Sequence, residues 1–384
     1  MTPDHGRPHL DQQRFSAGLL LVLTVIAVGG VLRLTASIVQ PLVIALLLSF
    51  VLNPIVEWFH RLRIPRIVGI LFVIALFLGI AFLVAYILYS SVQSVVRQLP
   101  LYVERLLSLL EQALEFFELP PDILAEFEIT RQIGSYVVSF SGSFLSVLGS
   151  ITMVLIFLLF LLLEKPYLRP KVMEALQGPR TDRIWRIVGH TNAQIGRYLS
   201  VKLVVSLATG LLVWGAFSII GVEFAFVWAV LSFLFNFIPS IGSIFIGVAS
   251  GVFAFVQFNP DPNPIVAAIV AMLTIQLVLG NVIDPKMQGD SLKISPVVIL
   301  FSLLFWGWLW GIVGLFLAVP LTVALKIVFE HIPGYEFVGV LMGRTANEED
   351  LVSHEGVTAS SVHTGHKHRV EETDTPEDRG IDNE

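Results

Sequence analysis

Residues 67–92 read IVGILFVIALFLGIAFLVAYILYSSV and contain no charged side chain. The hydrocarbon core of a bilayer takes about 20 apolar residues of α-helix, so this run is long enough to cross a membrane. Five further runs of spanning length lie at residues 15–32, 37–56, 143–163, 199–220 and 265–283. The pattern predicts an α-helical integral membrane protein that crosses the bilayer several times.

The composition of the whole chain agrees with this prediction. Of the 384 residues, 55% are hydrophobic and only 14% are charged, and the mean hydropathy is +0.80. Soluble domains carry about 25% charged residues, so bulk water cannot be the main environment. The chain has no cysteine, which excludes disulfides, thiol nucleophiles and cysteine-ligated zinc. We expect an all-α, polytopic protein built as one multi-span unit, with the lipid bilayer as a partner.

The first run, 15–32, follows Arg7 and Arg14 and superficially resembles a signal peptide. It is too long for a typical signal sequence, and a second run follows at once, so we expect it to remain as the first transmembrane helix.

Positive charges near span ends predict the orientation, because cytoplasmic loops collect lysine and arginine. The loop after the second run holds Arg61, Arg63 and Arg66, and the stretch from Glu164 to Lys202 holds many more. Residues 97–140 are acidic instead. We therefore place both basic regions in the cytoplasm, the acidic segment outside, and the amino and carboxyl termini in the cytoplasm.

These patterns divide the chain into regions. The expected regions are a cytoplasmic tail (1–14), three transmembrane helices (15–96), an extramembrane amphipathic helical segment (97–140), a transmembrane core (141–343) and a disordered cytoplasmic tail (344–384). The tail contains His363, His366 and His368, for which we expect no metal role.

The amphipathic segment carries Leu99, Val103 and Leu106 at helical spacing opposite an acidic face. It could pack on the bundle, contact another copy or lie in the membrane interface. Anionic lipid would repel the acidic face, which favours the first two.

Two apolar segments, 224–257 and 294–329, exceed the length of one ordinary span and are interrupted by glycine and proline. Each is predicted to be a broken or re-entrant helix, and both a hairpin and a kinked single span are compatible with the sequence. In the first segment we expect the helix to break around Pro239 and Gly242, because proline removes a backbone donor and glycine permits sharp turning. A break at membrane depth requires polar partners. The candidate substrate-path residues here are Asn236, Pro239, Ser240, Gly242 and Ser243.

A second polar cluster lies where the run 265–283 ends. Gln276 and Asn281 could continue a polar track towards Asn236, and Asp284 and Lys286 complete this part of the candidate substrate path. A charge deep in the bilayer would cost at least about 2.5–3.5 kcal/mol, so we expect Asp284 and Lys286 at a shallow helix end. Pro285 and Gly289 are expected to interrupt the helix.

The third feature is the run from Phe305 to Pro320. Trp306, Trp308 and Trp310 are typical of residues at the membrane–water interface. The structural breaks expected in this segment are Gly311, Gly314 and Pro320. If the tryptophans lie at an interface, the segment forms a hairpin of two half-helices.

The chain contains no Gly-x-Ser-x-Gly, His-Glu-x-x-His or P-loop motif. We therefore expect a protein that is not an enzyme, without a cofactor, a bound metal or a nucleic-acid partner.

Three blocks resemble the signatures of the autoinducer-2 exporter family of bacterial transporters: NFIPSIGS (236–243), GNVIDPKMQGDSLKISP (280–296) and LFWGWLWGIVGLFLAVPLTVALKI (304–327). The resemblance extends over about residues 15–340. It implies a homo-oligomeric transporter of the bacterial inner membrane whose named solute is the quorum signal autoinducer-2. Members also include sodium/proton antiporters. The positions that match the family pattern are Ile238, Pro239, Gly242, Asn281, Pro285, Gly289, Pro296, Gly311, Gly314 and Pro320.

Three functions follow as hypotheses. In the first, the broken segments form a path for a small polar solute, with half-helix amino termini favouring partial negative charge. In the second, the protein exchanges cations for protons, with Asp284 and Glu223 as the nearby acids. The third is a membrane scaffold, which the polar breaks disfavour.

Overall fold

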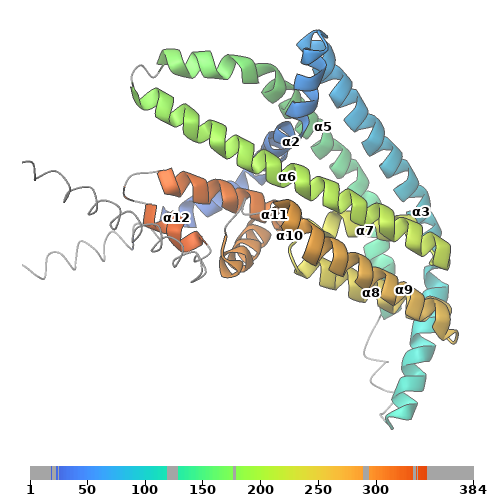
Figure 1. The fold of residues 1–384 in the computed structure, drawn as a ribbon. Coiled ribbons are helices and arrows are strands. Elements are labelled where there is room, and N and C mark those ends of the chain that lie inside the picture. Colours follow the sequence, from blue (N-terminus) through green and yellow to red (C-terminus); the bar gives the residue numbers. More distant parts are fainter. Residues whose placement is uncertain are drawn as a thin grey trace, which may run out of the picture.

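The computed structural model describes residues 19, 23–24, 26–118, 129–175, 179–288, 294–331, 334 and 336–343 (Figure 1). The predictions for the two tails, 1–14 and 344–384, and for Gly289 lie outside these residues. The helices are α2 (Ala36–Arg61), α3 (Arg66–Phe116), α5 (Ile129–Ala175), α6 (Pro179–Ile220), α7 (Ala225–Phe235), α8 (Ile241–Phe258), α9 (Pro262–Gln276), the π-helix η1 (Leu277–Ile283), α10 (Asp284–Gln288), α11 (Pro296–His331) and α12 (Glu336–Met342).

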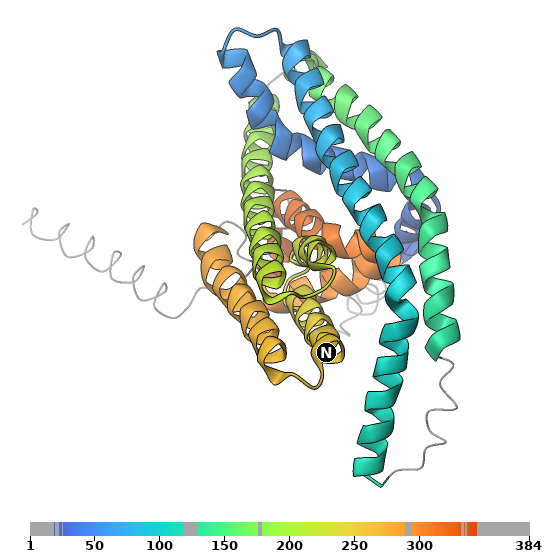
Figure 2. The same ribbon diagram turned by 90° about the vertical axis from the view of Figure 1, so that its right-hand side faces the viewer.

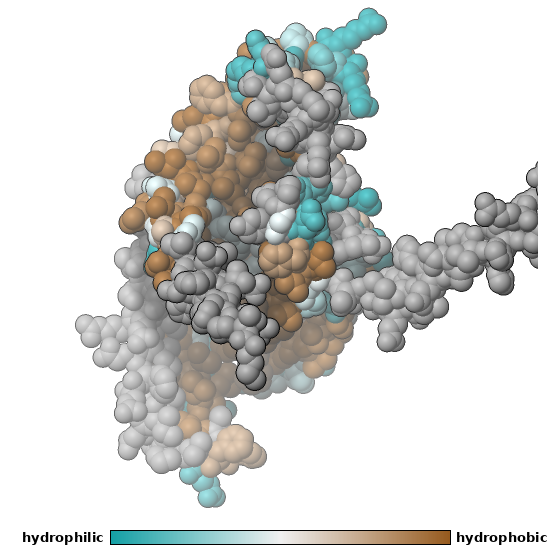
Figure 3. Space-filling model, turned by 90° about the vertical axis from the view of Figure 1, so that its left-hand side faces the viewer, coloured by the Kyte–Doolittle hydropathy of each residue, from teal (hydrophilic) through white to brown (hydrophobic). Residues whose placement is uncertain are grey.

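The long helices have the length and polarity of membrane spans, which confirms the predicted all-α, polytopic fold. Large apolar side chains lie exposed on their outer surfaces, as at Phe82 and Ile219. Figure 3 shows hydrophobic residues over the middle of one face and hydrophilic residues towards its ends. Among the described residues, the helices long and apolar enough to cross a membrane are Ala36–Arg61, Arg66–Gln98, Gly149–Leu168, Thr191–Ile220, Ile241–Phe258, Pro262–Gln288 and Pro296–His331.

The first two predicted runs follow one another more closely than expected. Residues 26–34 are helical, and only Thr35 separates them from α2. The amide of Thr35 donates to Val31 and its carbonyl accepts from Val39, so the hydrogen-bonded chain passes through this point without a loop. A cytoplasmic amino terminus requires that the segment before Thr35 crosses the membrane separately.

The predicted amphipathic helix is a direct continuation of the third span. α3 runs unbroken from Arg66 to Phe116 and extends past the bundle at its lower end in Figure 2. The guanidinium of Arg105 donates to the carbonyl of Gln257 at the end of α8. Tyr102 contacts Phe253 with 5.1 Å between ring centroids. The start of the extension therefore packs on the bundle, one of the two favoured interpretations.

Burial and a hydrogen bond to Glu223 raise the pKa of the half-buried Tyr102 hydroxyl. The phenol therefore stays protonated at neutral pH and can donate to that carboxylate.

The first long segment is a hairpin. α7 ends at Phe235, the chain turns through residues 236–240, and α8 returns beside α7 with Phe235 and Phe245 stacked at 4.9 Å. The Gln257 side chain donates to the carbonyl of Gly221 and accepts from the amide of Glu223, both at 2.9 Å. The two ends of the segment are thus tied together, which excludes a single kinked span.

Gly242 is required by the close approach at this turn. A Cβ atom there would lie 1.8 Å from the carbonyl oxygen of Phe235. The helix break predicted at Pro239 and Gly242 is therefore confirmed. Only a residue without a Cβ atom lets the backbone of α8 approach the carbonyl of Phe235 this closely.

The second long segment, α11, is also a hairpin. Gly311 has φ 62° and ψ −138°, a conformation open to glycine, and reverses the chain. The indole of Trp306 donates across the hairpin to Thr322 at 3.3 Å. A Cβ atom on Gly314 would lie 1.8 Å from the carbonyl oxygen of Trp306.

The prediction of three interfacial tryptophans is wrong for two of them. Trp306 and Trp310 are each only 7% exposed, because the hairpin packs them into a hydrophobic cluster with Leu317 and Val323. Trp308 is exposed and lies 5.3 Å from the guanidinium of Arg33.

Substitution of Gly314 by alanine should destabilise the protein, because the added methyl group meets backbone that cannot move aside. We expect a loss of at least about 1–3 kcal/mol, typical of overpacking, and a lower melting temperature in detergent. Gly215→Ala on α6 is the matched control, since nothing lies within 4 Å of its added Cβ. Equal melting temperatures for the two variants would contradict the hairpin geometry.

Candidate functional site

A cavity of about 1030 Å³ lies where the first hairpin meets α6, α9 and η1. One wall is α8, the opposite wall is α9 continuing through η1 into α10, and the floor comes from α6 and the turn 236–240. α8 and α9 pack against each other as an antiparallel pair (Figure 1). The cavity therefore lies among helices that have the character of membrane spans.

The structure brings most of the predicted path residues together around this cavity. Gly242 and Lys286 do not line it: Gly242 is buried against α7, and Lys286 is exposed. Gly311, Gly314 and Pro320 lie in the other hairpin, and only Val319 of that returning half reaches the cavity. The predicted residues that line it are Asn236, Pro239, Ser240, Ser243, Gln276, Asn281, Asp284 and Pro285.

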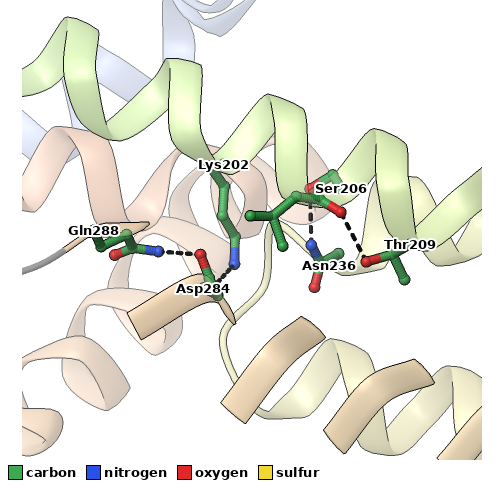
Figure 4. A network of polar contacts seen from close by, with 7 residues as sticks. Lys202, Ser206, Thr209, Asn236, Asp284 and Gln288 are labelled. Atoms are coloured by element: carbon green, nitrogen blue, oxygen red, sulfur yellow. Dashed lines mark hydrogen bonds and ion pairs between the residues drawn. The ribbon is translucent and has the colours of Figure 1, made fainter. Parts of the chain in front are cut away.

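A buried ion pair forms one end of the cavity (Figure 4). The ammonium of Lys202 on α6 lies 2.8 Å from the carboxylate of Asp284, and the two residues are 4% and 8% exposed. The side-chain amide of Gln288 donates to the other carboxylate oxygen. Asp284 thus has both oxygens occupied, and the charge of the pair sums to zero.

This arrangement adds detail to the predicted site. The helix continues through Pro285 to Gln288, and the carboxylate of Asp284 is enclosed by protein. Lys202, which lies within the predicted run 199–220 and within the span Thr191–Ile220, was not among the candidate residues. The sequence did contain an indication of a role for this residue. Lys202 is the only charged residue of the run 199–220, and a lone charge in a span indicates a functional position.

Further polar contacts continue from the ion pair along α6. The side-chain amide of Asn236 donates to the hydroxyl of Ser206 at 2.9 Å, and both residues are buried. Thr209, one turn further, donates to the carbonyl of Val205. Ser206 and Thr209 were not among the candidate residues, because isolated hydroxyls in an apolar helix more often bond to its own backbone.

Gln276 differs from these residues in having a free acceptor. It is 9% exposed, and its Oε1 atom has no hydrogen-bond partner among the described residues. An unpaired buried carbonyl costs about 1–3 kcal/mol, so a ligand hydroxyl bound here would remove that cost. Gln276 immediately precedes the π-helix η1, and such π-helical turns are frequent at functional sites.

The amino terminus of α8 is less available than expected. The amides of Ile241 and Gly242 already donate to the carbonyls of Pro239 and Ile238. Ser240 adopts φ 59°, a positive value that is uncommon for serine, which gives the turn its tight form. Recognition of a solute here therefore depends on side chains more than on the dipole of a half-helix.

The site has the chemistry of a binding cavity. It combines a neutral ion pair, amides and hydroxyls on one side with apolar walls on the other. Among the described residues, no group of three or more histidine, aspartate or glutamate side chains could hold a metal ion.

Removing one partner of the ion pair should destabilise the protein far more than removing both partners. Lys202→Met leaves a buried unpaired carboxylate, and we expect it to destabilise the protein by about 3–5 kcal/mol. Lys202→Met combined with Asp284→Leu should recover most of the melting temperature lost in detergent, and Lys286→Met should leave it unchanged. A double variant no more stable than Lys202→Met would contradict the pairing.

Comparison with known proteins agrees with the family resemblance seen in the sequence. The chain matches the sequence model of the AI-2E family transporter over residues 19–334. It is 31% identical to the AI-2 transport protein TqsA of Escherichia coli, covering 84% of this chain and 94% of the relative. It is also 31% identical to a putative transport protein of Borreliella burgdorferi (84% and 89% covered) and to the E. coli putative transport protein YhhT (88% and 96%).

The match to the family covers most of the chain, including both hairpins and the cavity. Such membership supports a role in membrane transport and points to a protein that is not an enzyme. The apolar helices and the bacterial relatives together support a multi-pass protein of the inner membrane. This chain belongs to the AI-2E transporter family.

Proposed function

We propose that this protein carries a small polar solute across the inner membrane through the cavity between α8, α9, η1 and α6. The observation that carries the proposal is the polar floor at a helix break between apolar helices, with the acceptor of Gln276 left free. Polar groups buried at such a position cost free energy unless they have a binding role. Transporters place their substrate sites at discontinuous helices.

Autoinducer-2 is the solute we favour. The relative TqsA carries this name at 31% identity. A small hydroxylated ring suits the cavity, because Gln276 can accept a hydrogen bond and Asn281 and Ser243 can donate or accept. We place the amino and carboxyl termini in the cytoplasm, and we propose a homo-oligomer.

Cation/proton exchange is the second candidate, and the buried ion pair favours it. A cation that bound to the carboxylate of Asp284 would have to displace the ammonium of Lys202 from a distance of 2.8 Å. The cation would add one positive charge to a buried site that is neutral as it stands, and an unpaired buried charge is costly. Binding of a cation and release of a proton would thus be linked at one pair of residues. Glu223 lies at the other end of α8 and has no part in this scheme.

Flux into proteoliposomes tests the two candidates together. We expect the wild type to transport autoinducer-2. Asn281→Leu should lower this flux at least about tenfold, because a lost hydrogen bond to the solute costs about 1.5 kcal/mol. Lys286→Gln is the matched control, because this neighbouring polar residue is exposed and lies outside the cavity.

A sodium gradient without autoinducer-2 provides the other arm of the experiment. The second candidate would replace the first if two results are obtained together. The wild type moves protons but not autoinducer-2, and the folded double variant Lys202→Met/Asp284→Leu moves no protons. Folded protein without either activity would contradict both.

A further inference from the structure

The cavity is open along one side, and the residues at this opening are apolar. On α8 the rim is formed by Ile244, Val248 and Val252, which recur every four residues and are 66%, 62% and 53% exposed. On the opposite wall the rim is formed by Leu273 and Leu277, which are 53% and 55% exposed. Two helical stripes thus border a groove with an open mouth.

This mouth opens onto the sides of the helices and not onto their ends. The rim residues lie within Ile241–Phe258 and Pro262–Gln288, both of which are long and apolar enough to be membrane spans. Exposed apolar residues on the sides of such helices face hydrocarbon. A molecule dissolved in the bilayer could therefore enter the groove laterally.

The two ends of the groove differ in chemistry. Lys202, Asn236, Gln276 and Asp284 lie at the end near the turn of the hairpin, whereas the stretch from Val248 to Val252 faces Ile269 and Leu273 without any charged residue. Gly247 and Gly251 keep α8 narrow along this stretch: an added Cβ would meet nothing within 4 Å at Gly247 and only Ile269 at Gly251. The apolar part is thus an open trough that continues from the polar end.

The size of the groove exceeds what a small ring requires. Its volume of about 1030 Å³ is at the upper end of the range for ligand pockets, which is about 300–1,000 Å³. From Ser240 to Val252 the helix rises by about 18 Å at about 1.5 Å per residue. A compact polar solute at the polar end would leave the apolar trough empty.

We propose that the cavity binds a single-chain amphiphile with an uncharged, hydroxylated head, which enters from the bilayer through the mouth between α8 and α9. This proposal rests on the proposed transport function and extends its substrate class from a small polar solute to one that carries an alkyl chain. The head lies at Gln276, whose free Oε1 accepts from a hydroxyl group, and the chain lies between Val248 and Leu273.

The charge of the site selects an uncharged head. Lys202 and Asp284 neutralise each other, Tyr198 beside them is buried, and no other charged residue lines the cavity among the described residues. A head with a net charge would either lie unpaired in this buried site or break the ion pair, and both are costly. A hydroxylated head forms hydrogen bonds and leaves the pair intact.

Direct binding to the full chain in nanodiscs tests this proposal, with tritiated 1-decanoylglycerol as the probe and scintillation proximity as the readout. We expect saturable binding that free glycerol does not displace. Val248→Trp, which fills the trough, should weaken binding at least tenfold, and Gln276→Leu should weaken it several-fold. Leu212→Trp on the exposed face of α6 is the matched control and should bind as the wild type does.

Three outcomes would overturn the proposal. They are non-saturable uptake that is equal in wild type and Val248→Trp, no binding at all, and equal losses in Val248→Trp and Leu212→Trp. Melting temperatures establish that each variant is folded. Flux of autoinducer-2 and of decanoylglycerol, measured after the same variants are reconstituted into proteoliposomes, separates the two claims. Autoinducer-2 flux without decanoylglycerol binding contradicts only the amphiphile, and saturable binding without flux of either compound contradicts the transport function.

Discussion

Backbone amides and carbonyls released by a helix break must find partners inside the protein, because hydrocarbon offers none. At the turn of the first hairpin the amides of Ile238, Ile241 and Gly242 donate to carbonyls within residues 235–239. In both hairpins the opposing half-helices also lie in close backbone contact. At Gly242 and Gly314 a Cβ atom would lie 1.8 Å from a carbonyl oxygen of the opposing half-helix. The positions of α8 and α11, and with them the walls of the cavity, depend on these two contacts.

The ion pair extends the same argument to side chains. Lys202 and Asp284 are 82 residues apart in sequence and lie on different helices, and each offsets the free-energy cost of burying the other. With Gln288 on the second carboxylate oxygen, the pair joins α6 to α10 at the polar end of the cavity. A polar site within apolar helices, with one free acceptor at Gln276, is the arrangement that a transported solute can use.

The sequence was sufficient to predict the helical membrane fold, the two broken segments and most of the polar residues around the cavity, because apolar length and the positions of glycine and proline act locally. It could not distinguish a hairpin from a kink, which depends on contacts such as that between Gln257 and Gly221. It also left Lys202 out of the candidate path and placed Trp306 at an interface. Both follow from the fact that burial depends on partners distant in sequence, Asp284 for the lysine and Thr322 for the tryptophan.

The most direct test of the cavity as a solute path uses the absence of cysteine in the chain. Ser243→Cys places one thiol in the cavity wall, and Asn263→Cys places one at the exposed start of α9 outside the cavity. The rate of modification by a water-soluble thiol reagent is measured with and without autoinducer-2. We predict that autoinducer-2 slows modification several-fold at position 243 and has no effect at 263. Equal rates with and without the solute at position 243 would contradict it.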